Sequence, residues 1–249
     1  MRFLGKNFKN VKFFYYLKNY LLLIIPNFFF RKTLEKRLSN FSKNEIDNLI
    51  ERVNYYNKID FEVKVDSTWS KLSDLKIEKK GKTYFFDAYS ISRNFSSKFK
   101  CNFLFGDIDY VPNKPSFVKS RPINNSQNSI LLKLNKVRHF QYVVDNIKLE
   151  NKADILFGRA AVFQKQRIDF YKKYFNHPMC DLGQINQGTN YDQWVKKKAS
   201  LDTHLKHKFI LCIEGNDVAS NLKWVMSSNS VAVMPKPKYE SWFMEGKLI

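Results

Sequence analysis

Three short segments of the chain place charged or polar side chains directly after a predicted β-strand. They are Gly106-Asp107-Ile108-Asp109, Gly158-Arg159 and Gly215-Asn216-Asp217. A carboxylate can accept a proton, a guanidinium binds phosphate oxygens, and the free N–H groups at a helix N-terminus attract anions. A base, a cation and an anion-binding turn together favour a reaction that transfers a group from a phosphorylated donor.

Each of these segments also has an ordinary structural explanation. An aspartate after a strand often caps a turn, an arginine often forms a surface ion pair, and Gly215-Asn216-Asp217 can be a tight turn followed by a helix cap. The Asp107-x-Asp109 spacing is also similar to the metal-binding pair of one class of sugar-nucleotide transferases. The roles of base, cap and metal ligand therefore stay open for these two carboxylates.

The elements that must position these segments follow from the hydrophobic pattern. Ser42 and Glu45 form a capping box before apolar residues at helical spacing, which predicts a helix over 43–57. Short β-prone runs follow at 62–66, 83–87 and 101–105. Further along, predicted strands at 153–157, 179–182, 208–214 and 230–234 alternate with predicted helices at 166–175 and 218–227. This alternation predicts a parallel sheet, whose ligands bind outside the carboxyl ends of its strands.

Composition and charge limit the class of protein. The 249 residues include 43 Lys and Arg against 23 Asp and Glu, which gives a net charge of +20. A 44% apolar content excludes a disordered chain. The positive charge indicates an anionic partner, which can be nucleic acid, a phospholipid surface or a phosphorylated substrate. A basic nucleic-acid-binding module is therefore one alternative function.

The first 32 residues contain seven basic and no acidic residues, interleaved with Phe and Tyr. Cations attract anionic headgroups and aromatic rings lie at the headgroup level, so this segment is predicted to lie on an anionic membrane surface. The alternative is an ordinary helix that docks on the core. The apolar run at 20–30 contains Pro26 and is too short to span a bilayer, which takes about 20 residues.

Several further segments occur in a linked order along the chain. They are Gly106–Pro112, Pro115–Pro122, Asn128–Phe140, Phe157–Ala161 with Arg167, Cys180–Gly183 and Lys208–Met244. Together, over roughly residues 100 to 249, they resemble the family 90 glycosyltransferases. The resemblance is closest to the bacterial lipopolysaccharide-biosynthesis branch of the capsule-associated-protein domain.

This resemblance implies an inverting, metal-independent transfer from a nucleotide diphosphate sugar, with no cofactor besides that co-substrate. It also implies an α/β protein of the GT-B type, in which two Rossmann-like domains face each other across a cleft, the second being incomplete. The expected organisation is a basic aromatic segment at 1–41, an acceptor-side α/β domain at 42–145, and a nucleotide-sugar donor domain at 146–249.

Carried over to this sequence, the resemblance places the catalytic base at Asp107, with Asp109 as the local competitor. The residues expected around the donor diphosphate are Arg159, Arg167, Gly215, Asn216, Asp217, Ser220, Asn221 and Lys223. No metal ligand is expected. The sequence departs from the family in the order Gly158-Arg159, and in Asn221, where eukaryotic members carry an arginine. Lys223 or Arg167 is therefore the expected cation.

The predicted function is transfer of a hexose to a lipopolysaccharide, a lipooligosaccharide or a related glycan. The expected partners are the nucleotide sugar, a glycolipid or glycan acceptor and an anionic membrane surface, without nucleic acid. The expected location is cytoplasmic, peripheral to the inner membrane. Because the family continues past the segment that resembles 242–249, we expect a C-terminal truncation that leaves Trp242, Phe243 and Met244 uncovered. An inactive glycosyltransferase remnant is the second alternative.

Overall fold

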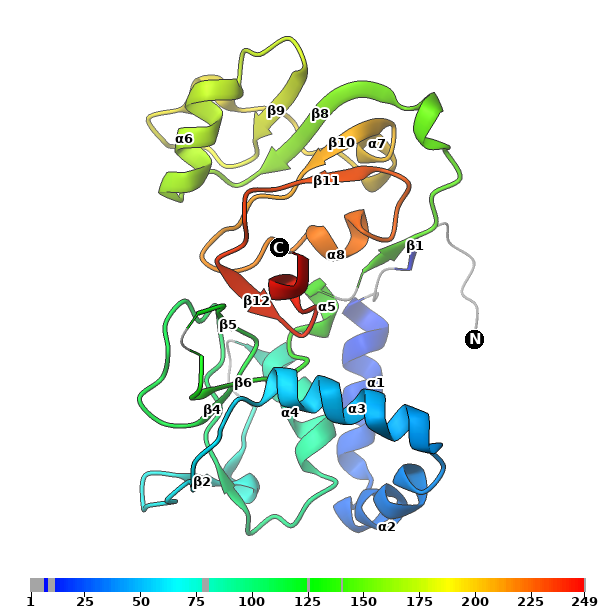
Figure 1. Ribbon diagram of the computed structural model, residues 1–249, viewed down its shortest axis with the longest axis vertical. Helices are drawn as coiled ribbons and strands as arrows, with labels where there is room; N and C mark the ends of the chain where they lie inside the picture. Colours follow the sequence, from blue (N-terminus) through cyan, green and yellow to red (C-terminus); the bar gives the residue numbers. More distant parts are fainter. Residues whose placement is uncertain (1–6, 9–11, 78–80, 125, 140, 249) are drawn as a thin grey trace. The chain divides into compact units, whose positions relative to one another are not determined.

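The computed structural model describes residues 7–8, 12–77, 81–124, 126–139 and 141–248. The fold is mixed α/β (Figure 1), and its internal contacts divide the chain into two units. We call Met1–Lys9 with Arg138–Pro237 the sheet unit, and Asn10–Val137 with Lys238–Ile249 the helix unit.

The sheet unit is built on four parallel strands in the order β11-β10-β8-β9. They are β8 (Ala153–Ala160), β9 (Cys180–Gln184), β10 (His207–Leu211) and β11 (Val231–Val233). In the middle of the sheet, Phe157 pairs with Asp181 on one side and with Ile210 on the other. The predicted parallel sheet is thereby confirmed. A short antiparallel pair, β1 (Asn7–Phe8) with β7 (Tyr142–Val143), belongs to the same unit.

Helices connect the parallel strands. They are α6 (Lys165–Tyr174) between β8 and β9, α7 (Leu201–His204) before β10, and α8 (Leu222–Val225) between β10 and β11. Two 3-10 turns, η2 (Leu149–Asn151) and η3 (Asp192–Trp194), lie in the connections, and α5 (Lys136–His139) stands at the boundary of the units. Figure 1 shows α6 beside β9. There Tyr171, which is fully buried, packs with Leu182 and Trp194 in the core.

The helix unit contains the four longest helices of the N-terminal half. They are α1 (Lys12–Ile24), α2 (Asn27–Leu38), α3 (Lys43–Tyr56) and α4 (Lys82–Ser92). The predicted capping box of α3 is confirmed, because the Glu45 N–H donates to Ser42 Oγ and the Ser42 N–H donates to the Glu45 carboxylate. Helix α4 is largely buried, and the Tyr15 hydroxyl of α1 donates a 2.8 Å hydrogen bond to its Asp87.

The strands of the helix unit form only pairs within its described residues. They are β2 (Ser70–Lys71) with β3 (Lys100–Cys101), β4 (Ser116–Val118) with β6 (Ser129–Leu131), and β5 (Ser120–Pro122) with β12 (Tyr239–Ser241). The β4–β6 pair is parallel and the other two are antiparallel. The 3-10 turns are η1 (Leu72–Asp74) and η4 (Glu245–Leu248).

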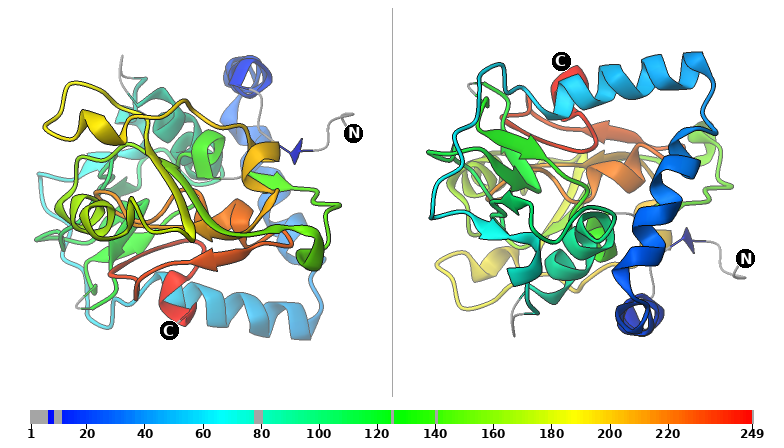
Figure 2. Two further views of the ribbon diagram at one scale, coloured as in Figure 1. Left: turned by 90° about the horizontal axis from the view of Figure 1, so that it is seen from above. Right: turned by 90° about the horizontal axis from the view of Figure 1, so that it is seen from below.

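A buried ion pair joins β5 to β12. Arg121 Nε lies 2.8 Å from Glu240 Oε1, and the two side chains are 0% and 1% exposed. The other guanidinium nitrogens of Arg121 donate to the backbone carbonyls of Tyr55, Tyr56 and Ser129. The C-terminal segment is thus held against the end of α3, and both views of Figure 2 show the red C-terminal turn beside that helix.

Two strands predicted in the helix unit are wrong. Residues 83–87 belong to α4, and residues 62–66 form no strand. The aromatic run at 83–87 is β-prone, but Tyr84 and Ala88, one helical turn apart, pack together with Leu134. Burial of that face outweighs the weak local preference for a strand.

The predicted domain boundaries also differ from the structure. The chain changes unit after Val137 rather than near 145, and residues 10–41 belong to the helix unit instead of forming a separate segment. The segment from Lys238 onward returns to the helix unit because β12 pairs with β5. Trp242 is only 9% exposed as a result, so the prediction of uncovered apolar surface at this residue is wrong.

Candidate functional site

The four-stranded sheet has a point where its strand order reverses. From β8 the chain crosses to β9 on one side, whereas from β10 it crosses to β11 on the other side, and β8 and β10 are neighbours. In open parallel sheets the loops that leave two such neighbouring strands diverge, which opens a crevice at their carboxyl ends. The reversal between β8 and β10 is therefore the position in the sheet unit where a ligand is expected.

Arg167, near the start of α6, reaches this position. Its Nη1 donates to the carbonyl of Ala161, just after β8, at 2.7 Å. Its Nε and Nη2 donate to the carbonyls of Glu214 and Ile213, just after β10, at 2.9 and 3.1 Å. One guanidinium thus ties together the two loops that leave the strands at the reversal.

The charge of Arg167 has no acidic partner among the described residues. All its hydrogen bonds go to backbone carbonyls, and it forms no ion pair there. Burial lowers the pKa of Arg167, and this effect outweighs the opposing influence of Tyr171. A buried cation without a paired carboxylate is costly unless an anion binds it. This is the electrostatic situation expected of a binding site for phosphate oxygens.

Glutamine side chains from the start of α6 hold the loop that follows β10. Gln166 Nε2 donates to the Gly215 carbonyl at 2.7 Å, and Gln164 Nε2 donates to Asn216 Oδ1 at 2.9 Å. A Cβ atom built on Gly215 would lie 3.0 Å from Arg167 Nη2. Glycine therefore lets the backbone approach the guanidinium closely at this point.

Arg159 lies inside β8 rather than in a loop after it, so its predicted position is corrected. Its Nη2 contacts both Asp181 carboxylate oxygens, at 3.0 and 3.1 Å. Asp181 also accepts a 2.8 Å bond from Lys196. Partial burial raises the pKa of Asp181, but the bonds from Arg159 and Lys196 outweigh it and leave that pKa lowered. Unlike Arg167, Arg159 is already neutralised by a carboxylate.

The predicted helix N-terminus at 216–218 is wrong. Residues 215–218 form bends, and α8 is a single turn that begins at Leu222. The amide of Asn221 donates to the Leu211 carbonyl at 2.9 Å, and the Gly215 N–H donates to the Asp217 carbonyl at 3.0 Å. These bonds fold the segment back on the end of β10, which prevents a helix from starting earlier.

The remaining predicted donor residues differ in exposure. Asn216 is exposed, Ser220 is half-buried, and Asp217 is 5% exposed. Lys223 is 2% exposed, so its ammonium is less accessible to a ligand than the sequence suggested. The ten-residue helix whose N-terminus lies at the strand reversal is α6. The sequence predicted this helix and placed its Arg167 near the donor, but it did not identify the helix N-terminus as part of the site.

The predicted base lies in the helix unit, on a loop whose conformation depends on glycine. Gly106 has φ +118, a backbone conformation that residues with a side chain rarely adopt. Ile108 points into a core cluster with Val118 and Leu131, while Asp107 and Asp109 on either side of it are exposed. The loop therefore presents two carboxylates on an anchored backbone.

Lys119 distinguishes the two carboxylates. Its ammonium lies 2.5 Å from Asp107 Oδ1, and the Lys119 side chain is only 2% exposed. A buried lysine that contacts one oxygen fixes the orientation of the Asp107 carboxylate and leaves it 31% exposed. Asp109 has no hydrogen bond or ion pair within the described part of the chain. The geometry favours Asp107 as the positioned group.

The carboxylate pair shows no sign of a larger ligand set. In the part of the chain that the structure describes, no group of three His, Cys, Asp or Glu side chains is placed to hold a metal ion. The independence from metal stays a prediction.

Sequence reasoning missed four residues that shape these sites: Lys119, Gln164, Gln166 and Asp181. Lys119 and Asp181 lie within the segments that carry the family resemblance, so their presence there was a usable signal. The two glutamines lie just outside any recognised segment. Only the fold reveals that they bind the loop after β10.

The N-terminal helices have two different faces. Tyr16 and Tyr20 of α1 pack on Phe86 of α4, which fits the core-docking alternative. Other apolar side chains of α1, α2 and the turn between them are exposed by 39 to 78%, namely Phe13, Phe14, Leu17, Leu21, Ile24, Ile25, Phe28 and Phe29. No single described helix is long and apolar enough to cross a bilayer. Helices α1 and α2 reach that length and apolar content only when they are taken together, and they meet at a bend of 103°.

Comparison with known proteins gives a direct similarity. The chain is 36% identical over 238 residues to the O-glucosyltransferase LpsA of Dichelobacter nodosus. The aligned part covers 94% of this chain and 74% of LpsA. No protein-family model matches the chain.

Proposed function

The chain belongs to the glycosyltransferase family of the O-glucosyltransferase LpsA, and from that premise we propose that it transfers a hexosyl group from a nucleotide diphosphate sugar. The proposed acceptor is a lipopolysaccharide, a lipooligosaccharide or a related glycan. The proposed reaction inverts the configuration of the anomeric carbon, as the resemblance to the family 90 glycosyltransferases of the GT-B type implies. The observation that carries the proposal is the buried Arg167 guanidinium at the strand reversal, which has no acidic partner among the described residues.

The donor diphosphate is proposed to bind at the start of α6. The first N–H groups of a helix have no intrahelical partners and carry the positive end of its dipole. Arg167 adds a full positive charge beside the Gly215 backbone. As the bond between the anomeric carbon and the diphosphate breaks, negative charge grows on the leaving oxygen, and these groups stabilise it. Arg159, bound to Asp181, positions the neighbouring strand edge.

Asp107 is proposed as the general base. The acceptor hydroxyl oxygen attacks the anomeric carbon, the bond to the diphosphate breaks, and the hydroxyl proton moves to the Asp107 carboxylate. A positioned base of this kind accelerates a reaction by about 10²- to 10⁴-fold. The contact with Lys119 holds the Asp107 carboxylate in a defined orientation for accepting the proton.

The acceptor is proposed to be reached from an anionic membrane surface on the cytoplasmic side, where the enzyme binds peripherally. The exposed apolar side chains of α1 and α2 support this proposal, because exposed apolar patches commonly mark interaction surfaces. Residues 12–38 also contain six Lys and Arg against the single Glu35. Apolar burial and attraction to anionic headgroups act together in interfacial helices.

The experiment that tests this function combines binding with turnover. Nucleoside diphosphates and their sugar conjugates are screened by thermal shift, because a ligand present at 100 times its Kd stabilises the folded state by about 2.7 kcal/mol. The best conjugate, radiolabelled in the sugar, is then incubated with lipooligosaccharide lacking its outer sugars, with and without a chelator. We expect one conjugate to raise the melting temperature and its sugar to enter the glycolipid in both conditions. Transfer that needs added manganese would point instead to a metal at Asp107 and Asp109.

A further inference from the structure

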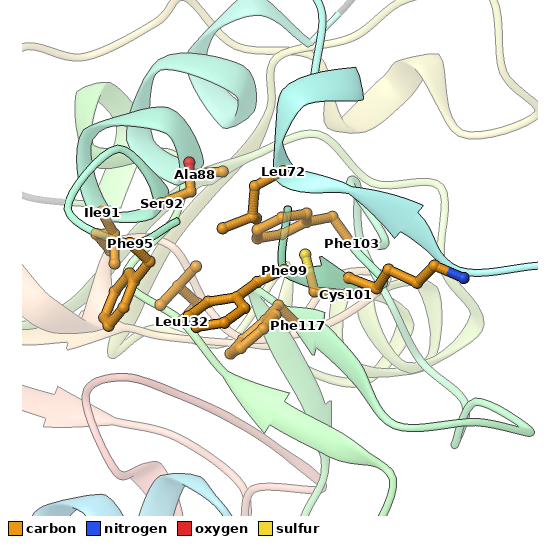
Figure 3. Close-up of a pocket in the computed structure, with 11 residues that line it drawn as sticks. Leu72, Ala88, Ile91, Ser92, Phe95, Phe99, Cys101, Phe103, Phe117 and Leu132 are labelled. Carbon is orange, nitrogen blue, oxygen red and sulfur yellow. The ribbon is translucent and has the colours of Figure 1, made fainter. Parts of the chain in front are cut away.

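The helix unit contains an apolar cavity of about 310 Å³ between α4 and the β3 and β4 strands. Figure 3 shows its walls, which are formed mainly by Leu72, Phe95, Phe99, Phe103, Phe117 and Leu132. The Cys101 sulfur lies among these rings (Figure 3). The lining residues include no carboxylate. This cavity has no part in the proposed sugar transfer.

The size and lining of the cavity suit a hydrocarbon chain. An apolar cavity of ~150 Å³ stays dry and takes one benzene ring, so one of about 310 Å³ has room for roughly twelve carbon atoms. Phe95 and Phe99 are 43% and 59% exposed, which places the mouth of the cavity at the surface. A linear chain can enter through such a mouth and bury its methylene groups against the rings.

Two arginines lie in a second hollow that shares walls with the first. This hollow, of about 420 Å³, has Leu72, Ser92 and Phe95 in common with the apolar cavity, and Arg31 and Arg93 also line it. The Nε atoms of both arginines are buried without a hydrogen-bond partner among the described residues. The second hollow also has no carboxylate among its lining residues. A negatively charged group is therefore the complementary occupant.

Arg93 is already fixed in place, whereas Arg31 is not. The terminal nitrogens of Arg93 donate to the carbonyls of Leu22 and Ile25 at the end of α1, and its guanidinium stacks 3.6 Å from the Phe30 ring centre. Arg31 makes no bond of this kind within the described residues, so its guanidinium is the group best able to turn toward an incoming anion.

We infer that the two adjacent hollows bind a single-chain anionic amphiphile, with about twelve carbons of its chain in the apolar cavity and its charged head near Arg31 and Arg93. The chain is a fatty acyl chain, and the head is a carboxylate or a phosphate. Binding needs neither the sugar donor nor the glycan acceptor, so it can succeed or fail independently of the transfer reaction.

The first test is a chain-length series. The purified full chain is titrated calorimetrically with octanoate, decanoate, dodecanoate and tetradecanoate, each below its critical micelle concentration. Each added methylene group is expected to strengthen binding about fourfold until the cavity is full near twelve carbons, after which affinity levels off. Absence of saturable binding, or affinity that keeps rising through tetradecanoate, contradicts a finite internal site.

The second test fills the cavity. Cys101→Trp places an indole among the rings and is expected to weaken dodecanoate binding at least tenfold without lowering the melting temperature. Lys98→Trp is the matched control, because Lys98 is exposed and does not line either hollow. Equal affinity in both variants overturns the assignment of the chain to this cavity.

The third test concerns the head group. Arg31→Gln is expected to weaken decanoate binding several-fold and to leave decanol binding unchanged, because only the anion loses a charged partner. An equal loss of affinity for decanoate and decanol would show that Arg31 does not bind the charged head. Competition of dodecanoate by lysophosphatidylglycerol with a twelve-carbon chain would identify membrane lipid as a source, and competition by free fatty acid alone would identify the free acid.

A fourth test uses the unmodified chain, so its result does not depend on whether a variant folds. Burial raises the pKa of Cys101 to about 11, so its thiol reacts slowly with iodoacetamide. Dodecanoate is expected to slow alkylation of Cys101 further, whereas alkylation of Cys180 in the sheet unit provides the internal control. Alkylation of Cys101 that is unchanged by saturating dodecanoate contradicts the proposal.

Discussion

The two units of this protein hold their functional side chains in different ways. In the sheet unit, Arg167 is fixed by three backbone carbonyls at the ends of long parallel strands. In the helix unit, Asp107 contacts the buried Lys119 side chain, on a loop between short strand pairs. Regular backbone structure can position a binding group without specific side-chain partners, whereas an irregular scaffold depends on individual pairs. The helix unit should therefore respond more strongly to single substitutions.

The largest effect is expected at the buried ion pair of the helix unit. Glu240→Gln leaves the fully buried Arg121 guanidinium without its counter-charge, which typically costs about 3 to 5 kcal/mol of unfolding free energy. The control is Asp169→Asn in the sheet unit, which breaks an exposed pair with Lys165 and should cost less than about 0.5 kcal/mol. Denaturant unfolding followed by tryptophan fluorescence measures both. Equal losses would contradict the expectation that burial makes the Arg121–Glu240 pair the more costly one to break.

Asp107→Asn should lower transfer by about 10²-fold or more, because the amide keeps the shape of the side chain but cannot take the proton. The affinity for the donor should stay the same, since the proposed donor contacts lie in other residues. Steady-state transfer rates and donor titrations measure the two quantities. Asp109→Asn is the matched control, and an inactive Asp109→Asn beside an active Asp107→Asn would reverse the assignment.

Substitutions on the proposed membrane-binding surface of the helix unit are expected to have an effect of intermediate size on vesicle binding. Replacing Leu21 and Ile24 by Glu removes two exposed apolar side chains and adds two negative charges, which should weaken binding to phosphatidylglycerol vesicles about tenfold or more. Asn44→Glu with Asn48→Glu in α3 adds the same charge without removing apolar surface. Sedimentation with vesicles compares the two proteins. Equal binding would return α1 to a purely structural role.

The smallest effect is expected from Asp181 in the sheet unit, and it depends on pH. The pKa of Asp181 is lowered in the folded protein, so the carboxylate stabilises the fold above its unfolded pKa of about 3.9. This contribution is lost as the pH falls through the lower folded value. Because the group is 39% exposed, the contribution should stay below about 1 kcal/mol. Asp181→Asn should flatten this part of the stability profile between pH 5 and 2, and an unchanged profile would contradict the pairing.

Sequence patterns predicted the sheet unit better than the helix unit. The strands β8 to β11 and helix α6 are continuous apolar or amphipathic runs, and α3 has a local capping box, so each carries its own signal. Helix α4 does not, because its aromatic run is β-prone and only its packing on Leu134 decides its structure.

The same distinction applies to the candidate site. Asp107, Arg159 and Arg167 could be singled out from their residue types, but their partners could not. Arg121 and Glu240 are 119 residues apart, and no spacing rule connects them. The start of α8 was predicted too early because the bond from the Asn221 side chain to the end of β10 is a tertiary contact. Local patterns therefore located the chemistry, and the fold determined which groups are paired.

The central claim is that the donor binds at the strand reversal through Arg167. Isothermal titration of the most stabilising nucleoside diphosphate against the unmodified chain, Arg167→Gln and Arg159→Gln tests it most directly. A charge-assisted contact to phosphate contributes about 1.5 to 3 kcal/mol, so Arg167→Gln should raise the Kd roughly 10- to 150-fold. Arg159→Gln should raise it less, because Asp181 already neutralises Arg159. An unchanged Kd in a folded Arg167→Gln protein would contradict the account.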